Sequence, residues 1–440
     1  MTPANLISLS KGGEVMYLSE IHRVYKEDSY FSMLDDFSFK AKNLYNNALF
    51  YVRQYYIYQR NLKEGKPVEN LIVPDEVLSY MKDKGSYINY NSLDYLAKQL
   101  NNSLTDDYKL LPLAAASQSV LKQLNTNCLS FFKSLKSYNK NPSKYNGRPK
   151  MPKYLDKENG RFGFALTNQN CKLKDGFLNF PKSFNGFTLK TKVDNLKQVR
   201  IVPKSNYYQI EIVYEVKEDL KVKDNSRYLS VDLGVTNLAA ITNNFNGEQW
   251  LISGKPIKSV NQYYNKLKSD YQSLAKKLNN KHITKRILKL TKKRNDRIDT
   301  YLHKASKLLV DLAISYDVSK IVIGYNQSWK QEINIGKRNN QNFVSIPFLT
   351  FVDYITYKAK LKGIEVILTE ESYTSGTSFL DGELPIKANY KKSRRINRGL
   401  FKSNNGKLIN SDVNGSYQIL KKVIGDYYVT PMSLRVLQVT

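Results

Sequence analysis

The chain has 440 residues, of which 69 are Lys or Arg and 39 are Asp or Glu, so its formal net charge at pH 7 is +30. A chain this basic repels itself unless an acidic partner neutralises it, and the phosphates of a nucleic acid are the most direct candidates. Only two cysteines occur, Cys128 and Cys171, which excludes a disulfide framework and a cysteine-rich zinc finger. Because no apolar run is long enough to span a bilayer and no export signal begins the chain, we expect a cytoplasmic protein that does not bind membranes.

The first half of the chain is predicted to be helical between two β-rich stretches. Residues 14–28 form one strand, and apolar positions at helical spacing then predict helices over about 33–60, 92–104 and 114–138. Residues 139–155 are rich in Asn, Pro, Gly and Lys, as is typical of a loop. From 160 to 218, short alternating runs between turns predict a small β-barrel whose first strand is the N-terminal one.

Residues 228–243, YLSVDLGVTNLAAITN, are predicted to be two strands joined by a tight turn at Gly234. Leu229, Val231 and Leu233 alternate with polar residues, which places Asp232 near the end of a rigid strand. A carboxylate held in this way is accessible to a hard cation such as Mg²⁺. The alternative is an ordinary solvent-facing acid, and this stretch alone does not decide between the two.

A basic helical segment follows over 256–316. Eight basic residues between 281 and 297 are expected to contact phosphates, and a solvated helix face is the alternative. They are Lys281, Lys285, Arg286, Lys289, Lys292, Lys293, Arg294 and Arg297. The predicted backbone contacts among them are Lys285, Arg286, Lys289, Lys293 and Arg297.

The C-terminal part supplies further acids at the ends of predicted elements. Residues 320–326 are predicted to be a buried strand and 363–375 a strand that leads into a turn, whereas 376–410 are polar and basic, as in a loop or appendage. Asp412 begins the last predicted helix, where an N-cap is the alternative role. Several carboxylates that converge on two divalent ions about 4 Å apart make a two-metal nuclease site, and Asp232 and Asp412 are its clear candidates.

At this point the chain resembles a known family. DLGVTNLAAIT and SDVNGSYQIL, with KRILKLTKKRNDRIDTYLHKAS and ESYTSGTSFLDG between them, are similar to the TnpB family of RNA-guided endonucleases encoded by insertion sequences, relatives of type V CRISPR effectors. The segment GRPKMPKY also resembles this family, and through it Arg148 and Lys150 are expected to contact nucleic acid. The likeness spans roughly residues 145–425.

The resemblance implies an α/β fold combined with a β-barrel. Residues 1–28 and 145–225 would form a split wedge barrel, 29–144 an inserted helical recognition domain, and 226–440 a RuvC-like nuclease domain of RNase H fold. The nuclease domain would include the basic helical segment 256–316 and the appendage 376–410. The implied partners are a guide RNA made from the transposon end and double-stranded target DNA beside a short flanking motif. A monomer with bound RNA is expected, in a prokaryotic cytoplasm and on the nucleoid when it binds DNA.

Two departures from the family pattern matter. Family members often carry four cysteines as a zinc ribbon, where this chain reads YTSGTSFLDGELP, so no zinc is expected. Many relatives also place the middle catalytic glutamate at the end of an IVIE strand, where this chain has IVIG and thus Gly324.

A replacement acid is available at the end of the next predicted strand, at Glu370 or Glu371. Neighbouring strand residues point to opposite faces, so only one of the two enters the site, and periodicity does not decide which. Similar proteins with a relocated acid place it three residues before a Thr-Ser pair, which matches Glu371. Glu371 is therefore preferred, with Glu370 in reserve and Glu332 as a third choice.

The resemblance then implies that Asp232, Glu371 and Asp412 hold two Mg²⁺ ions and cleave guided target DNA. If the glutamate is lost, the chain is instead a nuclease-inactive, RNA-guided DNA-binding protein that acts as a transcriptional repressor. A DNA-strand transferase is a further alternative, although no residue pattern requires strand joining.

Overall fold

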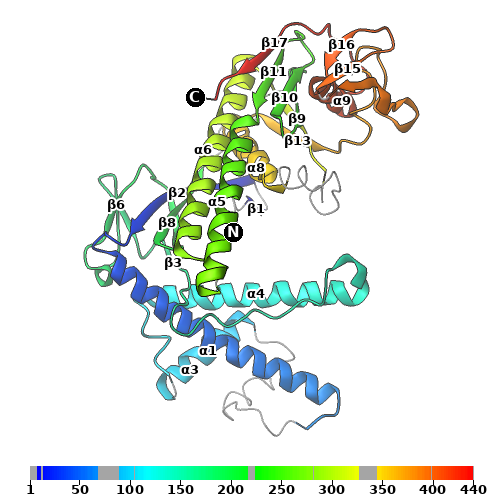
Figure 1. The fold of residues 1–440 in the computed structure, drawn as a ribbon. Coiled ribbons are helices and arrows are strands. Elements are labelled where there is room, and N and C mark those ends of the chain that lie inside the picture. Colours follow the sequence, from blue (N-terminus) through cyan, green and yellow to red (C-terminus); the bar gives the residue numbers. More distant parts are fainter. Residues whose placement is uncertain are drawn as a thin grey trace. The chain divides into compact units, whose positions relative to one another are not determined.

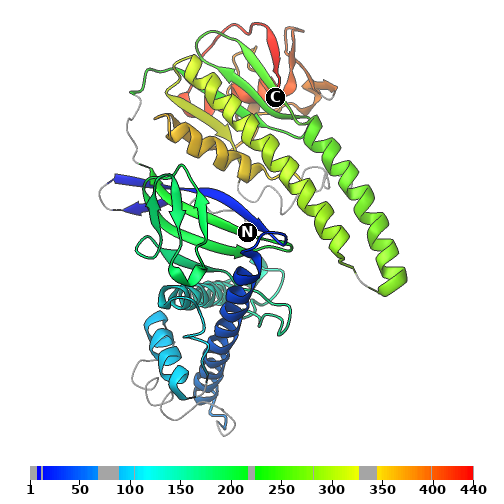
Figure 2. The same ribbon diagram turned by 90° about the vertical axis from the view of Figure 1, so that its left-hand side faces the viewer.

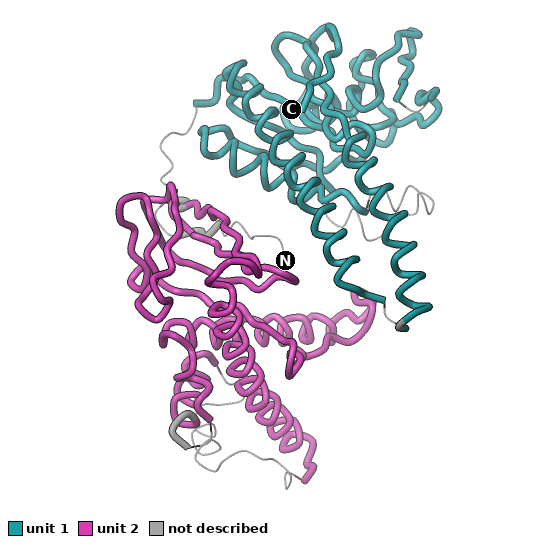
Figure 3. Tube along the Cα trace, turned by 60° about the vertical axis from the view of Figure 1, so that its left-hand side comes forward, with its two compact units in different colours: residues 1–2, 218–440 teal, residues 3–217 magenta. Residues whose placement is uncertain are grey.

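The computed structural model describes residues 7–10, 13–67, 89–103, 105–216, 223–280, 282–326, 344–397 and 399–439. The chain has a mixed α/β fold and forms two compact units, one of residues 3–217 and the other mainly of residues 218–440 (Figure 3). Of the helices within these ranges, none is both long enough and apolar enough to cross a membrane.

The unit of residues 3–217 contains a five-stranded sheet in the order β1-β2-β8-β7-β3. Its strands are β1 (Ile7–Ser10), β2 (Gly13–Tyr25), β3 (Phe164–Thr167), β7 (Leu196–Pro203) and β8 (Tyr207–Val216). Antiparallel pairing of β2 with β8 runs from Met16 opposite Val216 to Tyr25 opposite Tyr207. The N-terminal strand thus joins a sheet whose other long strands lie far along the sequence (Figure 1).

The single small barrel predicted for this unit is two sheets in the structure. Three short strands, β4 (Lys172–Lys174), β5 (Phe177–Asn179) and β6 (Thr188–Lys190), form a separate three-stranded sheet. Tight turns with positive φ at Asp175 and Asn185 connect to these strands, and strands of this length form few ladder hydrogen bonds. Alternation along the sequence predicts each strand but not which strands pair.

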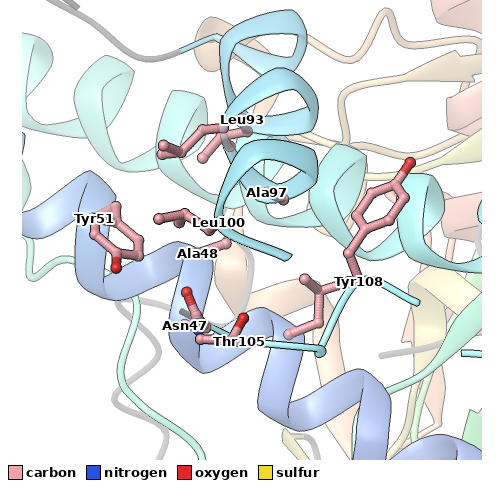
Figure 4. Close-up of a pocket in the computed structure, with 10 residues that line it drawn as sticks. Asn47, Ala48, Tyr51, Leu93, Ala97, Leu100, Thr105 and Tyr108 are labelled. Atoms are coloured by element: carbon pink, nitrogen blue, oxygen red, sulfur yellow. The ribbon is translucent and has the colours of Figure 1, made fainter. Parts of the chain in front are cut away.

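Three helices complete this unit: α1 (Phe31–Lys63), α3 (Tyr90–Ser103) and α4 (Ala114–Lys140). Leu34, Leu49 and Leu121 are fully buried in the core that these helices share with the sheet. A cavity of about 10 Å³ between α1 and α3 is lined mainly by apolar groups such as Leu44, Ala48 and Leu100 (Figure 4). This volume is at the limit for one water molecule, so we interpret the cavity as a packing gap.

The second unit contains a six-stranded sheet in the order β13-β12-β9-β10-β11-β17. The hairpin of β9 (Tyr228–Leu233) and β10 (Asn237–Asn243) is antiparallel and continues antiparallel into β11 (Gln249–Ser253). On the other side of β9, β12 (Lys320–Gly324) and β13 (Glu365–Thr369) run parallel to it. Strand β17 (Leu434–Leu437), which sequence reasoning did not predict, pairs with β11 at the opposite edge of the sheet.

Helices cover both faces of this sheet. Leu229, Val231 and Leu233 of β9 pack in one core with α6 (Lys285–Ser315) and α8 (Phe348–Lys360), a helix that the sequence analysis did not predict. Helix α9 (Ser411–Ile424) packs on the opposite face through residues such as Ile419 and Tyr417 (Figure 1). Because side chains alternate along β9, Asp232 lies on the α9 face.

The basic segment predicted over 256–316 is an antiparallel pair of helices, α5 (Lys255–Asn279) and α6 (Figure 2). Asn280, which ends α5, adopts a left-handed conformation with φ of 48°, and Thr284 caps α6 by accepting a hydrogen bond from the Ile287 amide. These two ends account for the break between the helices.

The appendage of residues 376–410 is built around a buried ion pair. Its strands β14 (Arg395–Asn397), β15 (Leu400–Lys402) and β16 (Leu408–Asn410) form a small sheet. Arg394 donates through both terminal nitrogens to Glu383, at 2.5 and 2.6 Å, and also donates to Asn404 at 2.8 Å. A bidentate pair of this kind fixes the local chain geometry as well as contributing energy.

Candidate functional site

Asp232 lies where α9 crosses β9. Gly415 permits the close approach of the helix, because a Cβ atom at that position would lie 2.6 Å from Asp232 Oδ2. Buried hydroxyl groups hold the two elements together. Ser230 donates to the Ser416 carbonyl at 2.6 Å, and the Ser416 hydroxyl lies 3.0 Å from both the Ser230 carbonyl and the Thr242 hydroxyl. The sequence analysis did not identify this network, since small polar residues in a strand carry no pattern.

Asp412 is the second residue of α9. The N-cap is Asn410, whose Oδ1 accepts hydrogen bonds from the amides of Asp412 at 2.9 Å and Val413 at 3.2 Å. The alternative that Asp412 itself caps the helix is therefore wrong. Its Oδ2 instead accepts a hydrogen bond from Asn237 at 2.8 Å, and its Oδ1 lies 3.6 Å from Arg395 Nη2.

Glu371 fills the space beside Gly324. A Cβ atom at position 324 would lie 2.6 Å from Glu371 Oε1 and 2.8 Å from its Cγ. The Glu371 amide donates to Asn326 at 3.0 Å, which fixes the chain just beyond β12 and β13. Glu371 Oε1 is buried without a hydrogen-bond partner among the residues that the structure describes. A buried, unpartnered carboxylate oxygen is costly unless a ligand satisfies it.

Glu370 is placed differently from its neighbour. Strand β13 ends at Thr369, so the two glutamates do not continue its alternation but lie in the turn after it. The Glu370 side chain is 61% exposed and pairs with Lys422, while Ser372 donates to it. Lys422, followed by Ser372, lowers the pKa of the Glu370 carboxyl. The third choice, Glu332, lies outside the described residues.

Burial and nearby charges disfavour the ionised forms of Asp232 and Glu371. Burial, followed by the negative charges of Glu371 and Asp412, raises the pKa of Asp232 well above its usual range, and Arg395 opposes this shift. Burial also raises the pKa of Glu371 to about 7, against the opposing charge of Lys422. Carboxylates with raised pKa values are destabilised as anions, so a bound cation would relieve their burial and repulsion.

Within the described ranges, no three His, Cys, Asp or Glu side chains are already gathered at metal-ligand spacing. The donor set nevertheless fits a hard divalent cation, because Asp232, Glu371 and Asp412 offer only oxygen ligands and one of these oxygens, Glu371 Oε1, lacks a partner. Mg²⁺ keeps several of its waters and needs few carboxylates, which suits a set of three.

The basic residues of α6 that are predicted to contact phosphates all have exposed side chains. They are Lys285, Arg286, Lys289, Lys293 and Arg297. Four of them, at intervals of four residues, form a stripe along the helix, which we call the α6 basic stripe: Lys285, Lys289, Lys293 and Arg297. Arg294 instead points inward and donates to Asn261 at 2.8 Å and to the Ser345 carbonyl at 2.6 Å.

Of the remaining basic candidates, Lys292 is half-buried on α6 and pairs with Asp296 at 2.8 Å, and the others are in the other unit or outside the described part. Arg148 and Lys150 are exposed in the extended segment that follows α4. Lys281 lies outside the described residues. His303 of α6 stacks on Tyr354 of α8 with ring centroids 3.8 Å apart.

Two family models match the chain. The model described as "Probable transposase", OrfB_IS605, matches residues 211–330, and the model described as "Cas12f1-like, TNB domain" matches residues 348–419. Over these two stretches the chain matches the OrfB_IS605 transposase family and its Cas12f1-like TNB domain. The segment that matches the first TnpB/OrfB model contains Asp232 and Gly324, and the segment that matches the TNB-domain model contains Glu371 and Asp412.

Similar proteins include two with curated descriptions. A CRISPR-associated endodeoxyribonuclease, Cas12f2, of a Micrarchaeota archaeon is 26% identical over 50% of this chain and 41% of its own length. A TnpB-like protein of Methanocaldococcus jannaschii is 23% identical over 37% of this chain and 60% of its own length. The chain thus matches less than two thirds of the length of either relative.

The solved structures with some similarity include two complexes of Cas12f proteins. A Cas12f1–sgRNA–target DNA complex matches 91% of this chain and 98% of the other at 14% identity, with a TM-score of 0.35. A CRISPR-Cas12f ternary complex matches 88% of this chain and 80% of the other at 15% identity, with a TM-score of 0.36.

Proposed function

We propose that this chain is an RNA-guided DNA endonuclease of a transposable element, which hydrolyses target DNA beside a short flanking motif. The observation that carries the proposal is the Glu371 carboxylate, which occupies the space left by Gly324 and has an unpartnered oxygen. This carboxylate would supply the acid that many relatives carry at the end of the strand corresponding to β12 and that this chain lacks there. Glu371 and Asp412 lie close enough to Asp232 for their negative charges to raise its pKa.

The sheet supports the assignment of a RuvC-like domain of RNase H fold. Three antiparallel strands, β9, β10 and β11, are extended on the β9 side by the parallel strands β12 and β13, with helices on both faces. Asp232 lies near the end of the central strand, and the Glu371 carboxylate lies beside the end of its parallel neighbour, β12. Carboxylates from different elements are therefore directed to one edge of the sheet.

The chain's own residues would prepare this edge for catalysis. Asp232, Glu371 and Asp412 would hold two Mg²⁺ ions, which when bound supply an activated water and stabilise the leaving oxygen of a phosphodiester. Asn237 orients Asp412 through its 2.8 Å hydrogen bond, and Asn326 fixes the backbone of Glu371. Because the pKa of Glu371 is raised to about 7, this carboxyl must release its proton to become a ligand.

Recognition of DNA would then be shared between the guide and the protein. Base pairing with the guide RNA reads the target sequence, and the protein binds the heteroduplex by its shape and backbone charge. The α6 basic stripe supports this role, because its exposed cations recur at one helix face. Each phosphate that they neutralise would release condensed counterions and make binding sensitive to salt.

Gly324 favours a second candidate, the nuclease-inactive, RNA-guided DNA-binding protein that acts as a repressor. The two candidates predict the same RNA and target binding and differ only in hydrolysis. The testing experiment is to purify the full chain after co-expression with its own flanking transposon DNA, sequence any RNA that co-purifies, and present a matching plasmid with Mg²⁺. The proposal expects RNA and cleavage. RNA and binding without cleavage would support the repressor, and the absence of RNA would contradict both.

A further inference from the structure

We infer that Lys422 is a positioning residue of the carboxylate site. Through its ion pair with Glu370 it ties the turn that carries Glu371 to α9, the helix whose second residue is Asp412. The pair joins two elements that each supply one carboxylate, so it fixes the position of one carboxylate relative to the other. This inference rests on the proposed function, because it names a further residue of the same site.

Lys422 lies in the last turn of α9, and its side chain is only 12% exposed. A lysine ammonium that has lost most of its water requires a nearby acid. Glu370 supplies this acid, although its own side chain is 61% exposed. A contact between two flexible surface side chains stabilises little. The Glu370–Lys422 pair differs from such a contact, because its cationic member is held by the protein around it.

Glu370 is also bonded within its own turn. The Ser372 amide donates to the Glu370 carboxylate at 3.2 Å, and the Ser372 hydroxyl donates to the same oxygen. The Thr374 amide and hydroxyl donate to the Glu371 carbonyl, at 3.3 and 2.8 Å, and close the turn. Pairing with Lys422 therefore holds the whole turn, rather than one side chain, against α9.

The residues of α9 that precede Lys422 lie against the same site. Ile419, three residues earlier, and Glu371 border the same point at the end of β12. Gly415, seven residues earlier and so on the same face of the helix, lies against Asp232. Lys422 is close enough to Glu371 for its charge to oppose the rise in the pKa of that carboxyl. One face of α9 thus contacts the site along its length, and the Glu370–Lys422 pair is the last of these contacts.

The first test measures the protection of the turn in the full chain with its co-purified RNA. Hydrogen–deuterium exchange reports local opening, so the amides of Glu371, Ser372 and Thr374 report on the turn. In EDTA we expect Lys422→Met to speed their exchange by about tenfold or more, the effect of losing one interaction with a charged group. Glu370→Gln should do the same, and Lys422→Arg should restore the protection because it keeps the charge.

Guided single-turnover cleavage at saturating Mg²⁺ then separates positioning from stability. Lys422→Met and Glu370→Gln should each lower the rate about tenfold, less than the roughly 100-fold cost of a 1 Å displacement, since the turn keeps its other hydrogen bonds. The double variant should be no slower than Lys422→Met, because the two side chains act through one pair. Lys422→Arg should cleave at nearly the wild-type rate.

Asp426→Asn is the matched control. Asp426 pairs at 2.7 Å with Lys421, the neighbouring residue of α9, and this pair also joins a 77% exposed acid to a buried lysine. Lys421 donates to the Gly382 carbonyl at 2.9 Å, so its side chain contacts the appendage rather than the turn. Asp426→Asn should therefore change neither the exchange of the turn nor the rate of cleavage.

Several outcomes would overturn the inference. Unchanged exchange in Lys422→Met would do so, as would an equal change in Asp426→Asn, which would assign the effect to the end of the helix. Faster exchange with wild-type cleavage would show that the pair only stabilises the turn. If Lys422→Met unfolds α9, Glu370→Gln and Lys422→Arg decide the question. If the wild type binds its target without cleaving it, the proposed nuclease fails, and the exchange rates alone show whether the pair holds the turn.

Discussion

Replacing Gly324 by Ala tests whether the missing side chain at position 324 is what admits Glu371. The added Cβ atom would lie 2.5 Å from Ile419 Cδ1, 2.6 Å from Glu371 Oε1 and 2.8 Å from Glu371 Cγ. An ordinary contact requires about 3.5 Å or more, so both side chains must move by about 1 Å. The strand itself cannot yield easily, because β12 is hydrogen-bonded between β9 and β13.

The two clashes have separable consequences. Overpacking against Ile419 should destabilise the fold by about 1–3 kcal/mol. Displacement of the Glu371 carboxylate should lower guided cleavage about 100-fold, since catalytic groups tolerate misplacement of only about 0.5 Å and 1 Å costs about two orders of magnitude. The assays are chemical denaturation and single-turnover plasmid cleavage in Mg²⁺.

The double variant Gly324→Ala with Ile419→Val supplies the control. Valine lacks the Cδ1 atom, so it removes the clash with residue 419 and leaves the clash with Glu371. We expect stability to recover while cleavage stays low, and Ile419→Val alone should cleave normally. Wild-type cleavage by Gly324→Ala would refute the reasoning, because Glu371 could then not be the group that fills this space.

Three further predictions concern charge. Changing Lys289 and Lys293 to Ala should reduce the slope of the logarithm of the target-binding constant against the logarithm of salt concentration by about one unit per lysine. The control is Lys307→Ala, which should leave this slope unchanged because Lys307 pairs with Asp311 at 2.5 Å. Equal slopes in all variants would contradict a role of the α6 basic stripe in phosphate binding. Burial lowers the pKa of Lys358 from 10.5 to about 8, so the unfolded chain binds more protons between these values and stability should rise by up to about 3 kcal/mol from pH 8 to pH 10.5. The stability of Lys358→Met, measured by chemical denaturation, should not rise over this pH range. If the variant keeps the wild-type pH profile, the rise does not come from Lys358. Arg394→Ala should destabilise the appendage by about 3–5 kcal/mol because it removes the ion-pair partner of Glu383, and unchanged chemical denaturation of this variant would contradict the role of the pair.

The sequence predicted the individual strands and helices better than the contacts between them. Period-two alternation places Asp232 on a strand, and the turn residues and helical spacing place Asp412 at a helix start, because both are local properties. Whether Glu370 or Glu371 faces Gly324 depends on where β13 ends and on the hydrogen bond from the Glu371 amide to Asn326, 45 residues away along the chain. Contacts of this kind have no local signal.

The supporting residues were missed for a related reason. Asn237 and Ser416 lie in segments whose patterns predict only a turn and a helix, yet they orient Asp412 and join α9 to β9. Asn414, in the DVN element, accepts from the Phe379 amide at 3.0 Å and donates to the Thr377 carbonyl at 2.8 Å, so in this structure it anchors the appendage. Motif residues alone do not distinguish a ligand from an anchor.

The central claim is that Asp232, Glu371 and Asp412 form one working site. Its most direct test is guided plasmid cleavage in Mg²⁺ by the wild type, Asp232→Ala, Glu371→Ala and Glu370→Ala. The account predicts cleavage by the wild type and by Glu370→Ala, and a loss of at least about 1000-fold in the other two with target binding retained. Full activity of Asp232→Ala, or cleavage that survives Glu371→Ala but not Glu370→Ala, would contradict it.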